Sequence, residues 1–371
     1  MFTQDHLQEL LSFYANGTPV VSMYLDTDCS QQSAETVKLQ VKGLLRELNG
    51  ANEQDAVVIE RFLDHSYDWT RPGLALFSCA PSDFFKAYPV AVSFRNRIRV
   101  GQKPYVKPLA HLLDYYAYYG VILLDRVGGR FFEYHLGDLQ QSEGVLGEEV
   151  RKLKKGGGSS SVGTRGGARG VQGGSRHEEE VAQRNMREAA KAAGQFFANK
   201  PIRRLFLGGT SENVAQFREL LSKQLQSCIA GTFSMDMTAG EHEVRKQTLV
   251  MLQQANLERE KRLVQTLLST NAQGGSATLG LDDTLQAISD KRVQTLIISD
   301  GLRTPGYVQD QAGFVVANLA RSPLSDRDML EVADVIDSAV AYTMIQGGHV
   351  EVISDDPDLE AVGRIGALLR Y

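Results

Sequence analysis

One segment of the chain has a composition that cannot form a packed core. Residues 151–176 contain seven basic residues and no acidic one, and nine of the nineteen residues from Gly156 to Gly174 are glycine. Because a segment rich in glycine and basic residues has few apolar side chains to bury, this composition predicts a mobile, positively charged loop. Such a loop is either a solvated linker or a segment that contacts the phosphates of RNA. The basic residues are Arg151, Lys152, Lys154, Lys155, Arg165, Arg169 and Arg176.

The residues on both sides of this loop predict an α/β domain. Before it, the apolar run 120–125 is typical of a buried strand, and Gly128-Gly129 predicts the turn of a hairpin. After it, a helix is expected to begin near Glu178, because its glutamates suit the positive end of a helix dipole. A strand at 204–207 and a helix at 213–225 are expected to complete the unit.

Two further blocks flank this region. The first ends near His111 and contains strand patterns at 20–25 and 74–78 with helical patterns at 37–48 and 57–63. The periodicity of apolar residues therefore predicts alternating strands and helices in this block.

The last block begins near Gly240 with a long helical pattern that extends from Glu241 to about Ser269. It continues with a short helix at 282–288, a buried strand at 293–299 and a helix at 326–338.

Composition narrows the class of protein. A length of 371 residues, with 42% hydrophobic and 23% charged residues, suits a globular chain of two or three domains. The net charge of -5 does not indicate a nucleic-acid binder as a whole, although a local basic patch can still contact RNA. Cys29, Cys79 and Cys228 form no CxxC pair, which favours a reducing cytosol over disulfides or a zinc site. With no signal peptide and no apolar stretch of membrane-spanning length, we expect a cytoplasmic protein without membrane, metal or cofactor.

Four collinear segments resemble the archaeo-eukaryotic class-1 release factor and Pelota superfamily. Residues 119–132, Tyr-Gly-Val-Ile-Leu-Leu-Asp and then Gly-Arg-Phe-Phe, resemble the opening hairpin of its middle domain. Residues 169–176, Arg-Gly-Val-Gln-Gly-Gly-Ser-Arg, stand where the family carries Arg-Gly-Gly-Gln at the head of a long helix. Residues 184–209 are similar to that helix and the strand after it, and residues 279–298 to the start of the C-terminal domain.

The resemblance implies a fold of the α/β and α+β classes with a three-domain, release-factor/Pelota-like architecture. The middle domain is expected to be ribonuclease-H-like, and the C-terminal domain to be an α/β sandwich similar to kink-turn-binding ribosomal proteins. The implied boundaries are 1–114 for a domain facing the decoding centre, 115–238 for the middle domain, and 239–371 for a partner-binding domain.

The resemblance also implies which residues meet RNA. The loop directed at the peptidyl-transferase centre would include Arg165, Arg169, Gly170, Val171, Gln172, Gly173, Gly174 and Arg176, with Gln172 at the catalytic glutamine position. Arg151, Lys152, Lys154 and Lys155 would contact RNA, as would Arg184, Arg187 and Lys191, which share one face of the following helix. That helix face is equally compatible with an ordinary exposed surface paired to Glu180 and Glu188.

Three departures from the family pattern limit what can be carried over. Val171 replaces the middle glycine of the catalytic tripeptide, and a β-branched residue resists the backbone conformations that glycine allows. We find neither an Asn-Ile-Lys-Ser match nor a Tyr-Cys-Phe pattern, so the sequence does not favour reading of stop codons. Residues 306–323 contain no cysteine, so the zinc ribbon of many bacterial relatives is not indicated.

Three functions follow as hypotheses. The first is a codon-independent factor of the ribosomal A site for rescue or hibernation, similar to Pelota and the bacterial Balon proteins. Its partners would be the ribosome, peptidyl-tRNA and a translational GTPase such as elongation factor Tu. The second is hydrolysis of peptidyl-tRNA through Gln172. The third is a metal-dependent nuclease that uses Asp125 with Asp138 and Glu143, although a strand-terminal aspartate at a turn explains Asp125 more simply.

One aromatic cluster is open to two interpretations. Four tyrosines, Tyr115, Tyr116, Tyr118 and Tyr119, lie within five residues and either stack on RNA bases or, more commonly, pack a domain junction.

Overall fold

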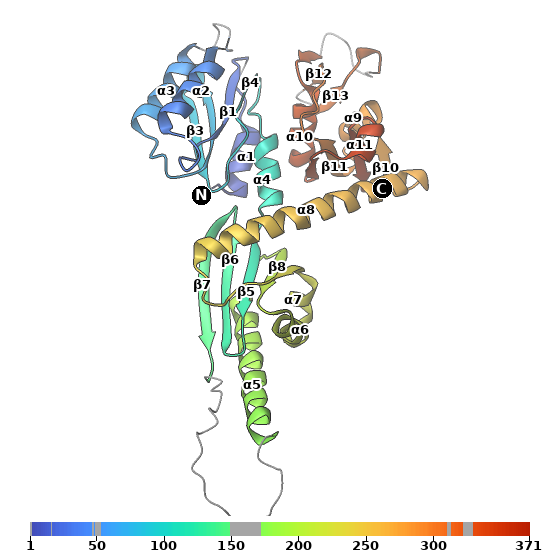
Figure 1. Cartoon of the computed structure of the whole chain (residues 1–371). Helices are drawn as coiled ribbons and strands as arrows, with labels where there is room; N and C mark the ends of the chain where they lie inside the picture. The colour runs from blue at the N-terminus through green and yellow to red at the C-terminus, as the bar shows by residue number, and fades with distance from the viewer. Residues whose placement is uncertain are drawn as a thin grey trace, which may run out of the picture. The chain divides into compact units, whose positions relative to one another are not determined.

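The computed structural model describes residues 2–15, 17–46, 48, 53–148, 172–309, 313–321 and 329–371 (Figure 1). Packing divides the chain into two compact units. Unit 1 consists of Met1–Tyr115 and Asn256–Tyr371, and unit 2 consists of Tyr116–Ala255. The mixed α/β and α+β class predicted from the sequence is confirmed, because each unit combines sheets with helices.

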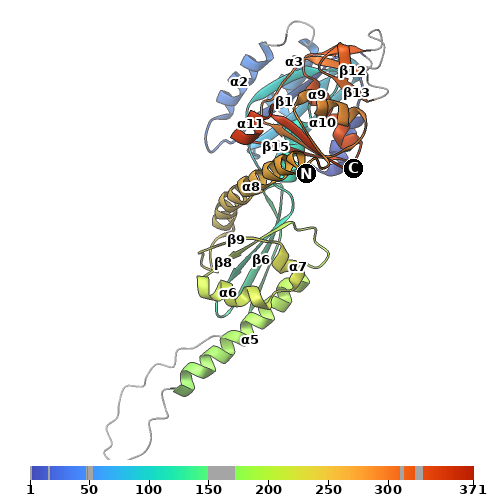
Figure 2. The same ribbon diagram turned by 90° about the vertical axis from the view of Figure 1, so that its right-hand side faces the viewer.

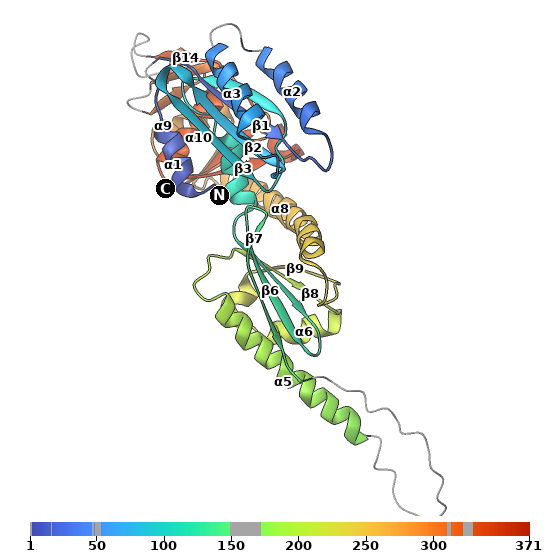
Figure 3. The ribbon, with the colours of Figure 1, turned by 90° about the vertical axis from the view of Figure 1, so that its left-hand side faces the viewer.

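The N-terminal part of unit 1 is a four-stranded antiparallel sheet in the order β3-β2-β1-β4 (Figure 3). Successive side chains of β1 point to opposite faces of the sheet. Met23 packs with helices α2 and α3 on one face, and Tyr24 forms an aromatic cluster with Phe77 and Tyr105 on the other. The elements are α1 (Gln4–Ser12), β1 (Val20–Asp26), α2 (Ala34–Arg46), α3 (Glu53–His65), β2 (Gly73–Cys79), η1 (Ala80–Ser82), β3 (Phe84–Val90), β4 (Arg97–Gly101) and α4 (Lys107–Tyr115).

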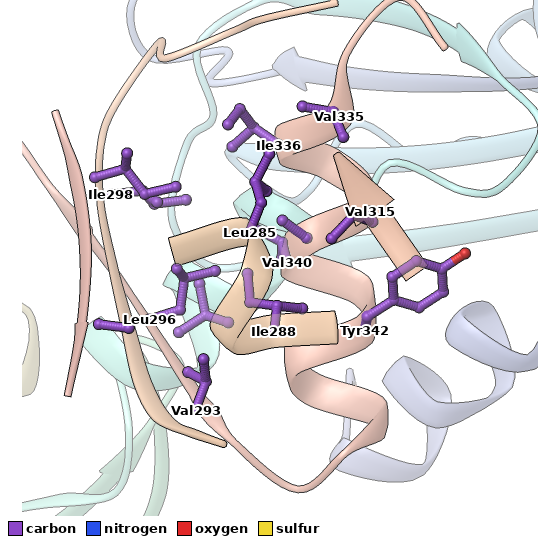
Figure 4. Close-up of a cluster of buried hydrophobic side chains, with 14 of the residues drawn as sticks. Leu285, Ile288, Val293, Leu296, Ile298, Val315, Val335, Ile336, Val340 and Tyr342 are labelled. Atoms are coloured by element: carbon purple, nitrogen blue, oxygen red, sulfur yellow. The ribbon is translucent and has the colours of Figure 1, made fainter. Parts of the chain in front are cut away.

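The C-terminal part of unit 1 contains two sheets. The larger has the order β10-β16-β11-β15, in which only β11 and β15 are parallel, and the smaller has the order β13-β12-β14. Figure 4 shows the core that α9, α10 and β11 form together, including Leu285, Leu296 and Ile336, all essentially buried. The elements are β10 (Ala277–Leu279), α9 (Leu281–Ser289), β11 (Val293–Ser299), β12 (Gly306–Gln309), β13 (Phe314–Val316), η2 (Leu319–Arg321), β14 (Leu330–Val332), α10 (Val335–Ile345), β15 (His349–Ile353), α11 (Pro357–Ala361) and β16 (Ile365–Leu369).

Unit 2 is built on a five-stranded sheet in the order β7-β6-β5-β8-β9 (Figure 2). Strands β5, β8 and β9 are parallel, and β6 pairs antiparallel with both β5 and β7, so only β6 runs opposite to the other four. This arrangement fits the ribonuclease-H-like middle domain expected from the sequence. Ile122 faces a core made with α5 and α6, whereas Val121 faces a core made with the first half of α8. The elements are β5 (Tyr119–Leu124), β6 (Gly128–His135), β7 (Asp138–Leu146), α5 (Gln172–Phe196), β8 (Arg204–Gly208), α6 (Ser211–Leu220), α7 (Lys223–Ser227), β9 (Ile229–Phe233) and α8 (Glu241–Ala272).

Two elements predicted from the sequence are wrong. Gly128-Gly129 is not a hairpin turn but the start of β6; the turn lies at residues 125–127. There the carboxylate of Asp125 accepts the backbone N–H groups of Val127 (2.7 Å) and Gly128 (2.9 Å). In the described part of 326–338, the expected helix is instead β14 followed by α10, whose first turn is capped by Asp334.

Other predictions hold with shifted boundaries. The strand at 293–299 and the start of the long helix at Glu241 are confirmed, and that helix continues to Ala272. The helix expected at 213–225 is divided into α6 and α7, because Ser222 caps the second helix. The boundaries 1–114, 115–238 and 239–371 for three domains stay a prediction.

Candidate functional site

The basic segment predicted to be functional connects β7 to α5 in unit 2. Arg151, Lys152, Lys154, Lys155, Arg165, Arg169, Gly170 and Val171 lie outside the described residues. The backbone of Gln172, Gly173, Gly174 and Arg176 forms the first turns of α5, so the helix begins six residues before the predicted position near Glu178. The candidate site is therefore the base from which this segment leaves and to which it returns.

Asn185 fixes the point where the chain leaves the sheet. Its side-chain amide is 2% exposed and donates hydrogen bonds to the carbonyl oxygens of Arg126 (3.1 Å) and Glu148 (2.9 Å). The N–H of Gly147 donates to the carbonyl of Val127 at 2.8 Å. One side chain of α5 thus holds both the β5–β6 turn and the two residues after β7, and it satisfies carbonyl groups that the sheet leaves unpaired.

Gly147 is required for this close approach. A Cβ atom at this position would lie 2.1 Å from Oδ1 of Asn185, far inside van der Waals contact. No side chain is accommodated there without displacing the asparagine.

The exposed face of α5 carries the predicted basic residues. Arg184, Arg187 and Lys191 are all exposed, because the buried stripe of the helix is formed by Met186, Ala189 and other small or apolar side chains. Arg184 pairs with Glu148 next to the Asn185 contact, through side chains that are 55% and 69% exposed. Such exposed pairs contribute little to stability.

Arg187 and Lys191 have a different environment. Within the portion of the chain that the structure describes, neither forms an ion pair. The predicted alternative, in which Glu180 and Glu188 pair with this face, therefore does not hold for Arg187 and Lys191. The face has donors available for an anionic surface such as a phosphate backbone.

A half-buried lysine that sequence reasoning missed, Lys200, lies just after the end of α5 and contacts the sheet. The ammonium of Lys200 lies 2.9 Å from a carboxylate oxygen of Glu133 on β6 and 2.8 Å from the amide oxygen of Gln141 on β7. It also lies 3.5 Å from the ring centre of Phe196. These contacts orient the helix on the sheet.

A missed arginine orders the chain before α8. The guanidinium of Arg130 donates to the carbonyl oxygens of Met237 (2.9 Å) and Ala239 (2.7 Å). Neither Lys200 nor Arg130 has a local sequence signature, because their partners are distant along the chain.

The acidic residues of the nuclease hypothesis do not converge. Both hydrogen bonds to Oδ1 of Asp125 come from its own turn, while Glu143 lies on the exposed strand β7 and accepts a hydrogen bond from Gln141 at 2.7 Å. Among the residues that the structure describes, no three His, Cys, Asp or Glu side chains are grouped to hold a metal ion.

The predicted tyrosine cluster makes packing contacts within the fold. Tyr119 is fully buried and stacks on Tyr134 with ring centres 5.1 Å apart, and burial raises the pKa of its hydroxyl well above its usual range. Tyr118 stacks on His135 at 3.8 Å. Tyr116 packs against the same core as Tyr119. Packing therefore accounts for Tyr116 and Tyr119.

Comparison with known families identifies the class of protein. Residues 104–253 match the family described as Bacterial archaeo-eukaryotic release factor family 10, and residues 257–371 match eRF1 domain 3. These two matches support a bacterial member of the archaeo-eukaryotic release factor and Pelota superfamily. Within the superfamily, the particular match is to family 10, and it covers almost all of unit 2.

Curated relatives agree with this assignment. A peptide chain release factor subunit 1 from Archaeoglobus fulgidus is 26% identical over 188 residues, which cover 45% of this chain and 46% of that protein. A pelota homolog from Methanocaldococcus jannaschii is 24% identical over 203 residues, which cover 52% and 49%. The chain thus matches about half the length of these relatives.

Solved structures show a distant likeness. The S. cerevisiae protein Dom34, described as a translation termination-like factor, is 11% identical with a TM-score of 0.40, over 81% of this chain and 86% of that one. None of the helices that the structure describes combines the length and apolar character of a membrane span.

Proposed function

We propose that this protein is a cytoplasmic translation factor that binds the ribosomal A site independently of the codon, in ribosome rescue or hibernation. Membership of the release factor and Pelota superfamily supports a role on the ribosome. The sequence lacks the two patterns used to read stop codons, which favours binding that does not depend on a codon.

The observation that carries the proposal is the construction of the loop base. Asn185 holds the chain after β7 against α5, and the same helix exposes Arg187 and Lys191. In the sequence, the segment 151–176 before them carries seven basic residues. A positively charged segment with a fixed base suits contact with an RNA backbone. Its basic side chains attract phosphates, and holding the base in place reduces the conformational entropy lost on binding.

Sedimentation with ribosomes tests this proposal. The full chain should move with 70S ribosomes at low salt and be released as salt rises. A variant lacking residues 156–171 loses Arg165 and Arg169, keeps α5 from Gln172 onward, and should bind more weakly with a smaller salt slope. If the protein stays at the top of the gradient, or if the deletion has no effect, the proposal fails.

Charge reversal on α5 gives a matched comparison. The pair Arg187→Glu and Lys191→Glu should weaken binding and reduce the salt slope by about 1–2. The control pair Arg218→Glu and Lys223→Glu changes the net charge equally at exposed positions of α6 and α7, and it should bind like the wild type.

Peptide release is the second candidate activity, and Gln172 carries it. This glutamine is the first residue of α5, at the head of a long helix where the family places its catalytic glutamine. Release of nascent peptide from stalled complexes, measured for the wild type and for Gln172→Ala, decides the question. An unchanged rate in the variant excludes catalysis by Gln172.

The C-terminal part is proposed to bind a translational GTPase such as elongation factor Tu. Its support is the match of residues 257–371 to a release-factor domain. Co-purification of the full chain with the GTPase in its GTP and GDP forms checks this partner.

A further inference from the structure

Unit 1 contains a cavity that the proposed function does not use. Its volume is about 290 Å³, and it lies between β4 with the residues that follow it and the beginning of α10 with β14. Both strands are at the edges of their sheets, so neither has a further strand beside it on that side. This volume is at the lower limit for small-molecule sites and suits a ligand of a few heavy atoms.

A carboxylate without a partner faces this cavity. Asp337, on the first turn of α10, lines the cavity, and it forms no hydrogen bond or ion pair among the described residues. Burial, and then repulsion by Asp334, raise the pKa of Asp337 to about 7 although Lys107, Arg99 and Arg303 favour its charged form. The charged carboxylate is therefore incompletely compensated and would gain from a cation placed beside it.

The nearby basic groups are engaged elsewhere. Nε of Arg303 lies 3.3 Å from Asp334, and Nη1 of Arg99 donates to the carbonyl of Ile98 at 2.9 Å. Lys107 is buried, and the pKa of its ammonium is lowered by that burial. Asp337 thus lacks a direct cationic partner within the fold.

The lining of the cavity offers both signs of charge and an apolar wall. Three basic residues (Arg99, Lys103, Arg303) and three acidic residues (Glu331, Asp334, Asp337) balance one another. Val100 and Leu330 are apolar lining residues that remain 44% and 47% exposed. A lining of zero net charge disfavours a simple ion but suits a molecule that carries both charges.

We propose that this cavity binds a small zwitterion of the α-amino-acid class with an aliphatic side chain. Its ammonium group lies against Asp337, its carboxylate against the Arg99 side, and its side chain against the apolar wall. Asp337 discriminates for the amine, because a half-buried carboxylate left unpaired is unfavourable.

Calorimetric titration of the full chain tests this site with three matched probes. L-Leucine carries both charges, 3-methylbutylamine lacks the carboxylate, and 4-methylpentanoate lacks the amine. L-Leucine should bind at millimolar concentration or tighter, and each of the other two should bind at least about tenfold more weakly, the loss of one charge-assisted hydrogen bond.

Variants locate the binding. Asp337→Asn and Arg99→Gln should each weaken L-leucine binding at least about tenfold. The control Asp358→Asn removes an exposed carboxylate on α11 and should bind normally. Fluorescence of Trp69, the one tryptophan of the chain, checks that each variant is folded. No heat with L-leucine, equal binding of the amine, or unchanged affinity in folded Asp337→Asn overturns the proposal.

Discussion

Asn185 is a polar residue at a position of α5 where the helical spacing calls for an apolar one. Val181, Ala182, Met186 and Ala189 surround it along the buried stripe. A polar residue within an apolar stripe is the signal by which the sequence could have indicated Asn185. A buried amide needs hydrogen-bond partners, and unpaired backbone carbonyl groups can provide them.

The first prediction concerns this amide. Asn185→Ala removes two hydrogen bonds and leaves carbonyl groups without donors, which should lower the free energy of unfolding of unit 2 by about 1–3 kcal/mol. Asn185→Asp should cost more, because it places a carboxylate against two carbonyl oxygens. Hydrogen exchange of peptides from β7 and α5 measures the loss of protection.

A control on the same helix separates this effect from general damage. Gln195→Ala changes an exposed polar residue of α5 and should alter protection by less than about 0.5 kcal/mol. If Asn185→Ala behaves like Gln195→Ala, the asparagine does not hold the loop base.

The second prediction concerns the pH dependence of unit 1. Asp337 has a pKa of about 7 in the fold against an ordinary value of 3.8. Between these values the folded chain holds a proton that the unfolded chain has lost, so the free energy of unfolding falls as pH rises from about 4 to 7. The contribution of Asp337 to the free energy of unfolding is complete below pH 3.8 and is lost above about pH 7.

Asp337→Asn should remove that part of the slope. Relative to wild type, the variant should gain about 2–4 kcal/mol between pH 4 and pH 8. Urea unfolding followed by Trp69 fluorescence reports on unit 1, where this residue lies in the N-terminal core. Parallel pH profiles for the two proteins would show that Asp337 titrates normally.

At the scale of elements, Lys200, which follows the end of α5, contacts Phe196 of that helix and residues of two strands. Replacing it by methionine leaves Glu133, a side chain 10% exposed, without its cationic partner. Lys200→Met should therefore destabilise unit 2 by about 2–4 kcal/mol, as breaking a buried ion pair does. Thermal unfolding followed by circular dichroism measures this. Lys191→Met, at an exposed position of α5, is the control and should be nearly neutral.

Much of the element pattern could be predicted from the sequence. Strand 293–299 and the long helix from Glu241 were predictable because continuous apolar runs and helical periodicity depend on local residues. The turn at Asp125 was misplaced because an aspartate side chain replaced the glycine pair as the turn-forming group. Strands β7, β10, β12 and β13 were missed because exposed strands and strands of three or four residues carry little apolar pattern and depend on pairing with other segments.

The candidate site was predictable only in part. The basic segment and the exposed face of α5 follow from composition and helical spacing. Asn185, Lys200 and Arg130 act through partners between about 40 and 110 residues away, which no local pattern reveals.

At the scale of the whole molecule, the two units divide the chain much as the family matches do. Unit 2 contains Tyr116–Ala255, and the family 10 match covers residues 104–253. In unit 1, Arg259 of α8 joins the N-terminal and C-terminal parts, with Nη2 2.5 Å from Asp114 and Nη1 2.6 Å from Glu351. The basic segment falls within the sequence range of unit 2 alone, so its proposed RNA contact can be tested by changes that leave unit 1 untouched.

The central claim is occupancy of the ribosomal A site, and competition with A-site tRNA tests it most directly. Labelled full-length protein is bound to 70S ribosomes that hold a P-site tRNA, and aminoacyl-tRNA delivered to the A site is then titrated in. We predict that the tRNA displaces the protein whatever codon is displayed, and that Arg187→Glu with Lys191→Glu is displaced at lower tRNA concentration. Undiminished binding to ribosomes whose A site is filled would contradict the account.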